Sequence, residues 1–422
     1  MLVLNCGGNS MYRLFKREQY LQKIRGFYHD CQIIKVLTGV RRCGKSSLMA
    51  LIADELKESG VRPDNIIFLD LDKRGYRKIK TADQLDALIE SVVANAGDGI
   101  KYLFIDEIQN VNGFEEVING WRSEDNFSIF ITGSNSYLLS GELATKLTGR
   151  YLEFEIFTLS FAEYLSMKAF YGQTISNNDL AELHQYIMDG GFPGAFQYPN
   201  AEDKRTYVMG IIDEIFEKDI KKRVQIRNRS NFDRVITYVI NNFGAMTSLS
   251  NIKKALEEDG VAIARETLNT YLQVLFDAKI LYECTRFDLK SKKSLLGDRK
   301  YYLADSSFYF ATNTDNRINY GPVLENMVYL YAKSQGYRIS VGRIGKLECD
   351  FILRGRNQNH AYVQVAYTIL ESIKNEDREY RSLEAIRDNY PKYVLTTDYI
   401  LQNRNGIKHC NLLTFMKEGQ LF

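Results

Sequence analysis

Histidine and cysteine are sparse in this sequence, and neither is grouped in a way that would build a metal centre or a disulfide framework. There are 4 histidines and 6 cysteines among 422 residues. The cysteines are scattered without paired spacing, at Cys6, Cys31, Cys43, Cys284, Cys349 and Cys410. This spacing is unlike that of a zinc site, and it favours the reduced thiols of a cytoplasmic protein.

Long hydrophobic runs and a strong net charge are also missing. No apolar run approaches the roughly 18 residues that a transmembrane helix needs, so we expect no membrane span. Residues 1–8 lack the basic stretch of a signal peptide, which again favours the cytoplasm. Because the formal net charge is only +2, any binding of nucleic acid would have to come from local basic patches.

The segment 39–46, Gly-Val-Arg-Arg-Cys-Gly-Lys-Ser, has the spacing of a phosphate-binding loop. A short β-rich run, 32–38, precedes it, and 47–57 follows with helical spacing. Backbone N–H groups of such a loop cradle phosphates, Lys45 would reach the β and γ phosphates, and the Ser46 hydroxyl would bind Mg²⁺. The residues that we expect to contact ATP are Gly39, Arg41, Arg42, Cys43, Gly44, Lys45, Ser46 and Ser47.

A second motif, 101–107, places two carboxylates after a run of apolar residues. This pattern predicts a central parallel strand that ends in Asp106 and Glu107 at the edge where open α/β sheets bind ligands. Asp106 would hold Mg²⁺ through water, and Glu107 would polarise the attacking water. The pair favours ATP hydrolysis over transfer of phosphate to a small molecule.

A further predicted strand, 127–132, ends in the polar segment 133–136, Gly-Ser-Asn-Ser. A side chain there could touch the γ-phosphate or the attacking water, with Asn135 the first candidate and Ser134 the second. The alternative is that these residues only form a turn.

Arg150 lies just before another predicted strand, 151–156. It could stabilise the charge of the transition state, either within its own chain or from a neighbouring subunit. The second case would require at least a dimer, so a homo-oligomer stays open. The alternative is a surface ion pair with Glu153 or Glu155.

The order of these motifs resembles the AAA+ superfamily. Within it, the sequence is similar to bacterial and archaeal ATPases that carry a C-terminal domain of uncharacterised function. The phrases that carry the resemblance are 37–45, 104–109, 131–136, 159–164 and 190–193. It implies a sensor-like role for Asn135, an arginine-finger position for Arg150, and a lid turn near the adenine at Pro193. A plain helix-ending turn would also account for Pro193.

The middle of the chain has the pattern of a winged helix. Helices are predicted at 250–257 and 264–276, and strands at 280–285 and 300–303. The segment between the strands is basic, and such a tip would contact the phosphates of DNA through Lys290, Lys292 and Lys293. The alternative is a structural module or a protein-docking surface.

The C-terminal part resembles the PD-(D/E)XK nuclease fold. A helix carrying Glu325 is followed by strands carrying Asp350 and Gln364. Gln364 could lend its carbonyl oxygen to a cation, but Ala366 stands where that fold has a lysine, which argues against cleavage. Lys374 in the next predicted helix could substitute for it.

We therefore expect an α/β P-loop NTPase with a parallel sheet and a helical lid, followed by a winged helix and a small α/β nuclease-like domain. The expected divisions are 1–158 for the ATPase core, 159–230 for the lid and connector, 231–310 for the winged helix, and 311–422 for an inactive nuclease-like domain. The start is left open between Met1 and Met11, and the stretch that begins at Met11 resembles the family's usual N-terminus.

The leading functional hypothesis is Mg²⁺-dependent hydrolysis of ATP that drives a conformational switch. The alternatives are an ATP-regulated endonuclease and a DNA- or protein-binding adaptor that does not hydrolyse ATP.

Overall fold

The computed structural model describes residues 14–422 except 134–146, 148, 222, 223, 225, 227, 314–317 and 356–358. The chain divides into two compact units, Met1–Ile156 and Phe157–Phe422. The predicted lid, winged helix and nuclease-like segments thus all fall in the second unit.

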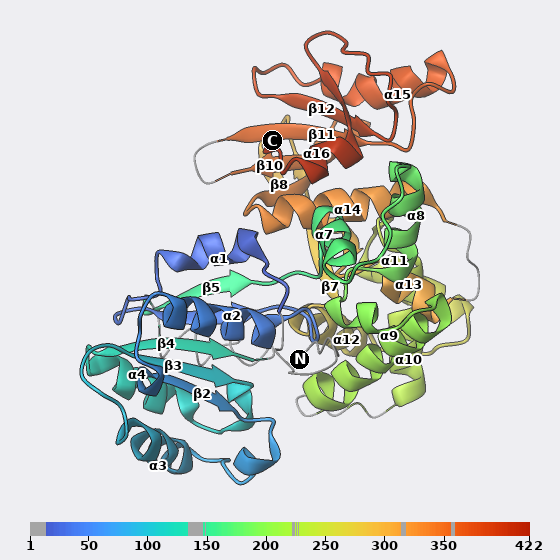
Figure 1. Ribbon diagram of the computed structural model, residues 1–422. Coiled ribbons are helices and arrows are strands. Elements are labelled where there is room, and N and C mark those ends of the chain that lie inside the picture. Colours follow the sequence, from blue (N-terminus) through green and yellow to red (C-terminus); the bar gives the residue numbers. More distant parts are fainter. Residues whose placement is uncertain are drawn as a thin grey trace. The chain divides into compact units, whose positions relative to one another are not determined.

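The first unit is built on a five-stranded parallel sheet with the strand order β2-β3-β4-β1-β5 (Figure 1). The strands are β1 (Ile34–Thr38), β2 (Ile66–Asp70), β3 (Lys101–Asp106), β4 (Phe127–Thr132) and β5 (Tyr151–Glu155). The helices are α1 (Glu18–Arg25), α2 (Lys45–Glu58), α3 (Ala82–Val93) and α4 (Phe114–Ser123), with short 3₁₀ turns η1 (Pro63–Asn65), η2 (Arg74–Tyr76) and η3 (Ile108–Asn110). This architecture confirms the predicted α/β fold with a parallel sheet.

Helices cover both faces of this sheet, which explains why its strands are continuous apolar runs. On one face, Leu85 of α3 and Ile118 of α4 pack into a fully buried cluster with residues of all the inner strands. On the other face, where α1 and α2 lie (Figure 1), Phe104 stacks on Phe130 with ring centroids 4.7 Å apart. The sheet therefore holds its carboxyl edge rigidly, and the phosphate-loop candidate and Asp106 both lie there.

The second unit combines helices with a second sheet. Its helices are α7 (Phe161–Phe170), α8 (Asp179–Asp189), η4 (Pro193–Gln197), α9 (Ala201–Ile215), the π-helical turn η5 (Phe216–Ile220), α10 (Arg229–Asn241), α11 (Leu249–Glu258), α12 (Arg265–Asp277), α13 (Ser307–Thr312), α14 (Tyr320–Ser334), α15 (Ile373–Glu384) and α16 (Leu412–Lys417). Its strands are β6 (Met246–Thr247), β7 (Leu281–Asp288), β8 (Lys293–Leu303), β9 (Arg338–Ile344), β10 (Leu347–Arg354), β11 (His360–Val365), β12 (Lys392–Thr396) and β13 (Lys408–Asn411). The helices expected at 250–257 and 264–276 are confirmed as α11 and α12.

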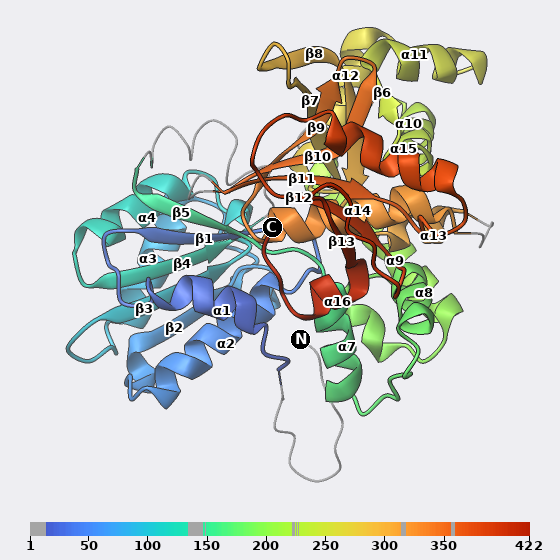
Figure 2. The same cartoon turned by 90° about the horizontal axis from the view of Figure 1, so that it is seen from above.

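The strands of the second unit form one eight-stranded sheet with the order β13-β12-β11-β10-β9-β7-β8-β6. Figure 2 shows β8, β7, β9, β10, β11 and β12 one after another. The link is a short parallel pairing in which Arg286, Phe287 and Asp288 of β7 face Val341, Gly342 and Arg343 of β9. The hairpin predicted as the wing and the strands predicted as nuclease-like thus belong to the same sheet.

A turn at Gly190 and Gly191 ties three segments of the second unit together. The Gly191 N–H donates to Oδ2 of buried Asp305 at 2.8 Å, and the Gly191 carbonyl accepts from the Leu159 N–H at 2.7 Å. A Cβ at Gly191 would lie 2.4 Å from the Leu159 carbonyl oxygen. Pro193 follows after Phe192 and begins η4. The predicted lid turn is therefore a packed junction that only glycine fits.

We expect Gly191→Ala to lower the free energy of unfolding by about 2 kcal/mol, because the added methyl group must displace backbone atoms. Circular dichroism during denaturant unfolding would measure the change. Gly210→Ala is the matched control: it lies in α9 with nothing within 4 Å of its Cβ position, and alanine favours a helix. Equal stability of the Gly191 variant and the wild type would show that the junction tolerates the methyl group.

Candidate active site

The loop between β1 and α2 has the backbone of an anion cradle. Gly39, Arg42 and Gly44 all have positive φ, at 136°, 68° and 106°. A Cβ at Gly39 would lie 2.1 Å from the Ile156 carbonyl oxygen, so this position requires glycine. Successive turned N–H groups, followed by the N-terminus of α2 at Gly44, create a positive concavity. The loop therefore fits a phosphate chain.

Lys45 and Arg17 hold this loop in shape. The Lys45 Nζ donates to the carbonyls of Gly39 and Val40 at 3.0 and 3.2 Å. Arg17 Nη1 donates to the Cys43 carbonyl at 3.1 Å. Arg17 was not predicted, because it lies 26 residues from the loop in sequence and belongs to no motif. The lysine amine thus lies over the loop, where its charge can meet an anion.

The side chains of the loop are not all turned the same way. Cys43 is fully buried, and burial raises the pKa of its thiol. Arg42 and Ser46 are exposed, and Ser47 is half-buried. Cys43 can therefore offer only its backbone to a nucleotide, whereas the Ser46 hydroxyl is accessible to a cation.

Asp106 and Glu107 are linked by Thr132, which ends the neighbouring strand β4. The Thr132 hydroxyl donates to Asp106 Oδ1 and accepts the Glu107 N–H at 3.2 Å. The parallel register that pairs Ile105 with Ile131 brings Thr132 beside the two acids. Thr132 was missed from the sequence, although its place at the end of a strand was visible. Asp106 is only 4% exposed, so its orientation is fixed.

Glu107 has a left-handed backbone, with φ at 56°, which is uncommon for a residue with a side chain. Its carboxylate lies 3.9 Å from Arg41 Nη2 of the loop and accepts a hydrogen bond from the Gln109 amide. Burial raises the pKa of Glu107, while the cations of Arg41 and Lys45 oppose that rise. Gln109 was also missed. These contacts hold an acid beside the loop.

The residues present suit Mg²⁺ and a nucleoside triphosphate. The Ser46 hydroxyl and the Asp106 carboxylate are oxygen ligands, which Mg²⁺ prefers. They follow β1 and β3, whose carboxyl ends share one edge of the sheet. The glycine-lined cradle, the lysine and the two acids together form a site for phosphate chemistry.

Comparison with known proteins agrees with this geometry. A family model described as "AAA domain" matches residues 32–165, and one described as "Domain of unknown function (DUF8612)" matches residues 180–317. An uncharacterized protein of Haemophilus influenzae is 35% identical over 396 residues, which cover 94% of this chain and 96% of the relative. The chain belongs to this family of AAA-domain proteins.

A second relative belongs to the same family, and one solved structure has a similar fold. An uncharacterized protein of Methanocaldococcus jannaschii is 32% identical over 365 residues, covering 84% of this chain and 79% of the relative. The solved structure of a Walker-type ATPase of Pyrococcus abyssi covers 71% of this chain and 95% of its own, with a TM-score of 0.50 and 18% identity. That structure shows a shared fold.

Arg150 lies at the opposite edge of the AAA-domain sheet from the loop. It precedes β5, and the register pairs Tyr151 with Ile34, the first residue of β1. The 5 residues of β1 span about 16 Å. Arg150 Nη1 instead donates to Asn119 Oδ1 at 3.2 Å. This position is far from the loop within the sheet, and the catalytic role of Arg150 stays a prediction. Asn135 and Ser134 lie outside the described residues.

A charged cluster in the second unit changes the expectation for Glu325 and Asp350. The Lys300 ammonium of β8 lies 2.9 Å from Glu325, 3.2 Å from Glu348 and 3.6 Å from Asp350. Lys300 is only 5% exposed. A buried lysine thus occupies the place among the carboxylates where the sequence suggested a cation, and it is Lys300, not Lys374, that joins them.

The side-chain carbonyl of Gln364 is occupied beside this cluster. Its Oε1 accepts from the Asp350 N–H at 3.4 Å and from the Ser382 hydroxyl at 3.2 Å, and its Nε2 donates to Glu379. The expectation that Gln364 offers its carbonyl to a cation is therefore wrong. Among the residues that the structure describes, no group of three or more His, Cys, Asp or Glu side chains suits a metal ion.

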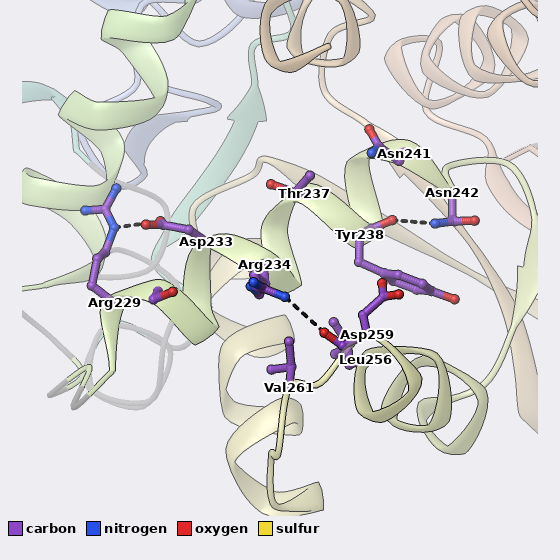
Figure 3. A pocket seen from close by; sticks show the side chains of 11 residues that line it. Arg229, Asp233, Arg234, Thr237, Tyr238, Asn241, Asn242, Leu256, Asp259 and Val261 are labelled. Atoms are coloured by element: carbon purple, nitrogen blue, oxygen red, sulfur yellow. Dashed lines mark hydrogen bonds and ion pairs between the residues drawn. The ribbon is translucent and has the colours of Figure 1, made fainter.

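A separate hollow lies along α10 in the second unit (Figure 3). Its charged groups are engaged locally: Arg229 Nε lies 2.6 Å from Asp233 Oδ1, and Arg234 donates to the Asp259 carbonyl at 3.1 Å. Arg229 and Asp233 pair with each other, and the remaining charges, on Arg234 and Asp259, are of opposite sign. The hollow therefore does not favour a ligand of one charge, and we assign none. Within the described ranges, no helix has the length and apolar character to cross a membrane.

Proposed function

We propose that this AAA-domain protein binds Mg²⁺-ATP in the loop 39–47 and hydrolyses it. The observation that carries the proposal is the contact set around Glu107. Thr132 joins Glu107 to Asp106, and Arg41 lies 3.9 Å from the Glu107 carboxylate. A general base must lie within reach of a water at the γ-phosphate, and this set supports such a place for Glu107.

Each residue has a distinct task in this proposal. The loop N–H groups and Lys45 bind the phosphates, while Ser46 and Asp106 hold Mg²⁺, which neutralises charge on the transferred phosphoryl group. Glu107 orients the attacking water. The Arg41 guanidinium, also on the loop, would bind phosphate and hold Glu107 in place until nucleotide arrives.

The proposal also gives roles to three further residues, Asn135, Arg150 and Pro193. Asn135 would sense the γ-phosphate, and Arg150 of a neighbouring copy would stabilise the transition state. Pro193 would face the adenine from the lid turn. The Arg150 role requires a homo-oligomer.

The expected result of Lys45→Met is loss of ATP binding by at least tenfold, because the loop loses the side-chain ammonium that is bonded to its Gly39 and Val40 carbonyls. Titration with a fluorescent ATP analogue would measure it. Lys57→Met, at the exposed end of the same helix and paired with Asp54, is the matched control. Unchanged ATP affinity in the Lys45 variant would remove the loop from the nucleotide site.

For the second unit we propose a conformational output, not cleavage of DNA. The order α11, α12, β7 and β8 supports a winged helix, and α14 with β9 to β12 supports a nuclease-like fold. The ammonium of Lys300 among the carboxylates and the engaged Gln364 both argue against an endonuclease. The winged helix would contact DNA through Lys290, Lys292 and Lys293.

A further inference from the structure

The tips of two hairpins of the second unit lie side by side. The parallel pairing of β7 with β9 aligns the ends of both strands, and the Leu289 N–H donates to the Arg343 carbonyl at 3.0 Å. A Cβ placed on Gly345, in the turn between β9 and β10, would lie 3.6 Å from Lys290 Nζ in the turn between β7 and β8. The two turns therefore form one surface.

This surface is strongly basic. It carries five exposed cations, Lys290, Lys292, Lys293, Arg343 and Lys346. None of the four lysines forms an ion pair with a carboxylate in the part of the chain that the structure describes. Asp288 and Glu348 are the nearest acids in sequence. Asp288 Oδ1 accepts the Ser291 N–H at 2.7 Å, and Glu348 lies 3.6 Å from Arg286 and 3.2 Å from Lys300, outside the five cations. Hydrogen bonds to Ser291 and the charge of Arg343 lower the pKa of Asp288, but one carboxylate does not neutralise five cations.

The backbone presents these cations on a stiff base. Lys292 and Gly345 have left-handed φ values of 55° and 64°, as tight turns require. Below them, the side chains of Phe287, Leu289 and Leu347 pack against the buried cluster that contains Ile344. Because the base is packed, little conformational entropy of the backbone is lost when the tips bind a partner.

We propose that the two turns together, 289–293 and 343–346, bind the phosphate backbone of double-stranded DNA. The inference rests on the proposed winged helix and extends its DNA contact from one hairpin tip to two. The five cations are joined by the exposed hydroxyls of Ser291 and Ser294, and lysine, arginine and serine are the usual donors to phosphate. Binding would be independent of sequence.

The chemistry of the tips favours nucleic acid over a membrane or an apolar protein face. The apolar side chains of both turns, Leu289 and Ile344, face the sheet and are half-buried or buried. A membrane-binding tip would need exposed apolar or aromatic residues to insert. Phosphates along a duplex match two adjacent rows of cations without any such insertion.

Binding of a fluorescein-labelled 30-base-pair duplex, measured by anisotropy over a range of salt concentrations, tests the proposal. Each lost phosphate contact reduces the slope of log K against log salt by about 0.9. We therefore expect a wild-type slope near −4.5, a reduction of about 1.8 for Arg343→Gln with Lys346→Gln, and about 2.7 for the triple Lys290, Lys292 and Lys293→Gln variant. The control Lys57→Gln with Lys417→Gln removes two ion-paired lysines and should leave the slope unchanged.

The outcomes separate the claims. If Arg343→Gln with Lys346→Gln behaves like the control while the triple variant weakens binding, the second hairpin is not part of the surface. Lys346→Gln alone, with an expected reduction of about 0.9, checks this result, because Arg343 also donates to the Gly345 carbonyl within the turn. Binding to phosphatidylserine vesicles is measured with the same variants. If no variant changes DNA binding, or if the protein binds the vesicles but not the duplex, the DNA assignment is wrong. ATP hydrolysis is measured in parallel without DNA. A loss of ATPase activity is thereby distinguished from a loss of DNA binding.

Discussion

Glu107→Gln is expected to stop ATP turnover while ATP remains bound. The amide keeps the shape of the side chain but cannot accept a proton from the attacking water. Loss of a general base typically lowers the rate by about 10²–10⁴-fold. The loop contacts of Lys45 and the Thr132 contact to Asp106 do not involve the Glu107 carboxylate. Phosphate release and binding of a fluorescent ATP analogue would be measured on the same preparation.

The matched control for this prediction is Glu124→Gln, which changes an exposed glutamate just after α4. It should hydrolyse ATP at the wild-type rate. Turnover by Glu107→Gln within twofold of the wild type would mean that another group activates the water, and the assignment of Glu107 would be abandoned.

The second large effect is expected for Lys300→Met, which should lower the free energy of unfolding by about 3–5 kcal/mol, because removing one partner of a buried pair leaves uncompensated charge. Burial pulls the pKa of Lys300 down, but the carboxylates of Asp350, Glu325 and Glu348 raise it above its ordinary value. Burial raises the pKa of both Glu325 and Asp350. Without Lys300 these acids would prefer to be protonated still more strongly.

The pH dependence of this destabilisation has a definite sign. A carboxyl group whose pKa is raised in the folded state contributes stability at low pH and loses it as the pH rises. The penalty of Lys300→Met should therefore be smaller at pH 4 than at pH 8. Adding Glu325→Gln removes one of the unpaired acids and should recover part of the loss. Denaturant unfolding at both pH values would measure these changes.

Lys293→Met, at the exposed start of the same strand, is the control and should have little effect. If Lys300→Met is as stable as that control, the cluster does not depend on its lysine. A pH-independent loss would instead point to packing of the lysine stem as the cause.

The sequence was sufficient for the parts of the site that lie in one continuous segment. The run 32–57 combines strand, loop and helix signals locally, so the loop and its flanking elements could be predicted. The acids at 106 and 107 were predicted for the same reason, as the end of an apolar strand. What the sequence could not supply was the partners that other strands bring.

Thr132, Gln109 and Arg17 show why these partners were missed. Thr132 reaches Asp106 only because β3 and β4 pair in one particular register, and Arg17 approaches the loop from outside any motif. Lys300 was missed because a lysine in a strand ordinarily faces solvent, whereas here three carboxylates from α14 and β10 surround it. Such contacts depend on tertiary packing.

The shared sheet of the second unit was also beyond local reasoning. The strands of 231–310 and 311–422 were predicted as parts of two modules. The pairing of β7 with β9 joins residues more than 50 positions apart, and the chain between them carries two helices, α13 and α14. Neither strand alone signals that pairing, because strand patterns specify a buried face but not a neighbour.

The most direct test of the central claim is a single-turnover experiment with Mg²⁺ and the protein in excess over radiolabelled ATP. Under these conditions every bound ATP is followed, so even slow hydrolysis is detected. We predict conversion of bound ATP to ADP and phosphate by the wild type, and ATP that stays intact on Glu107→Gln. ATP that binds stoichiometrically to the wild type but stays unhydrolysed would contradict the proposal and make ATP a structural ligand.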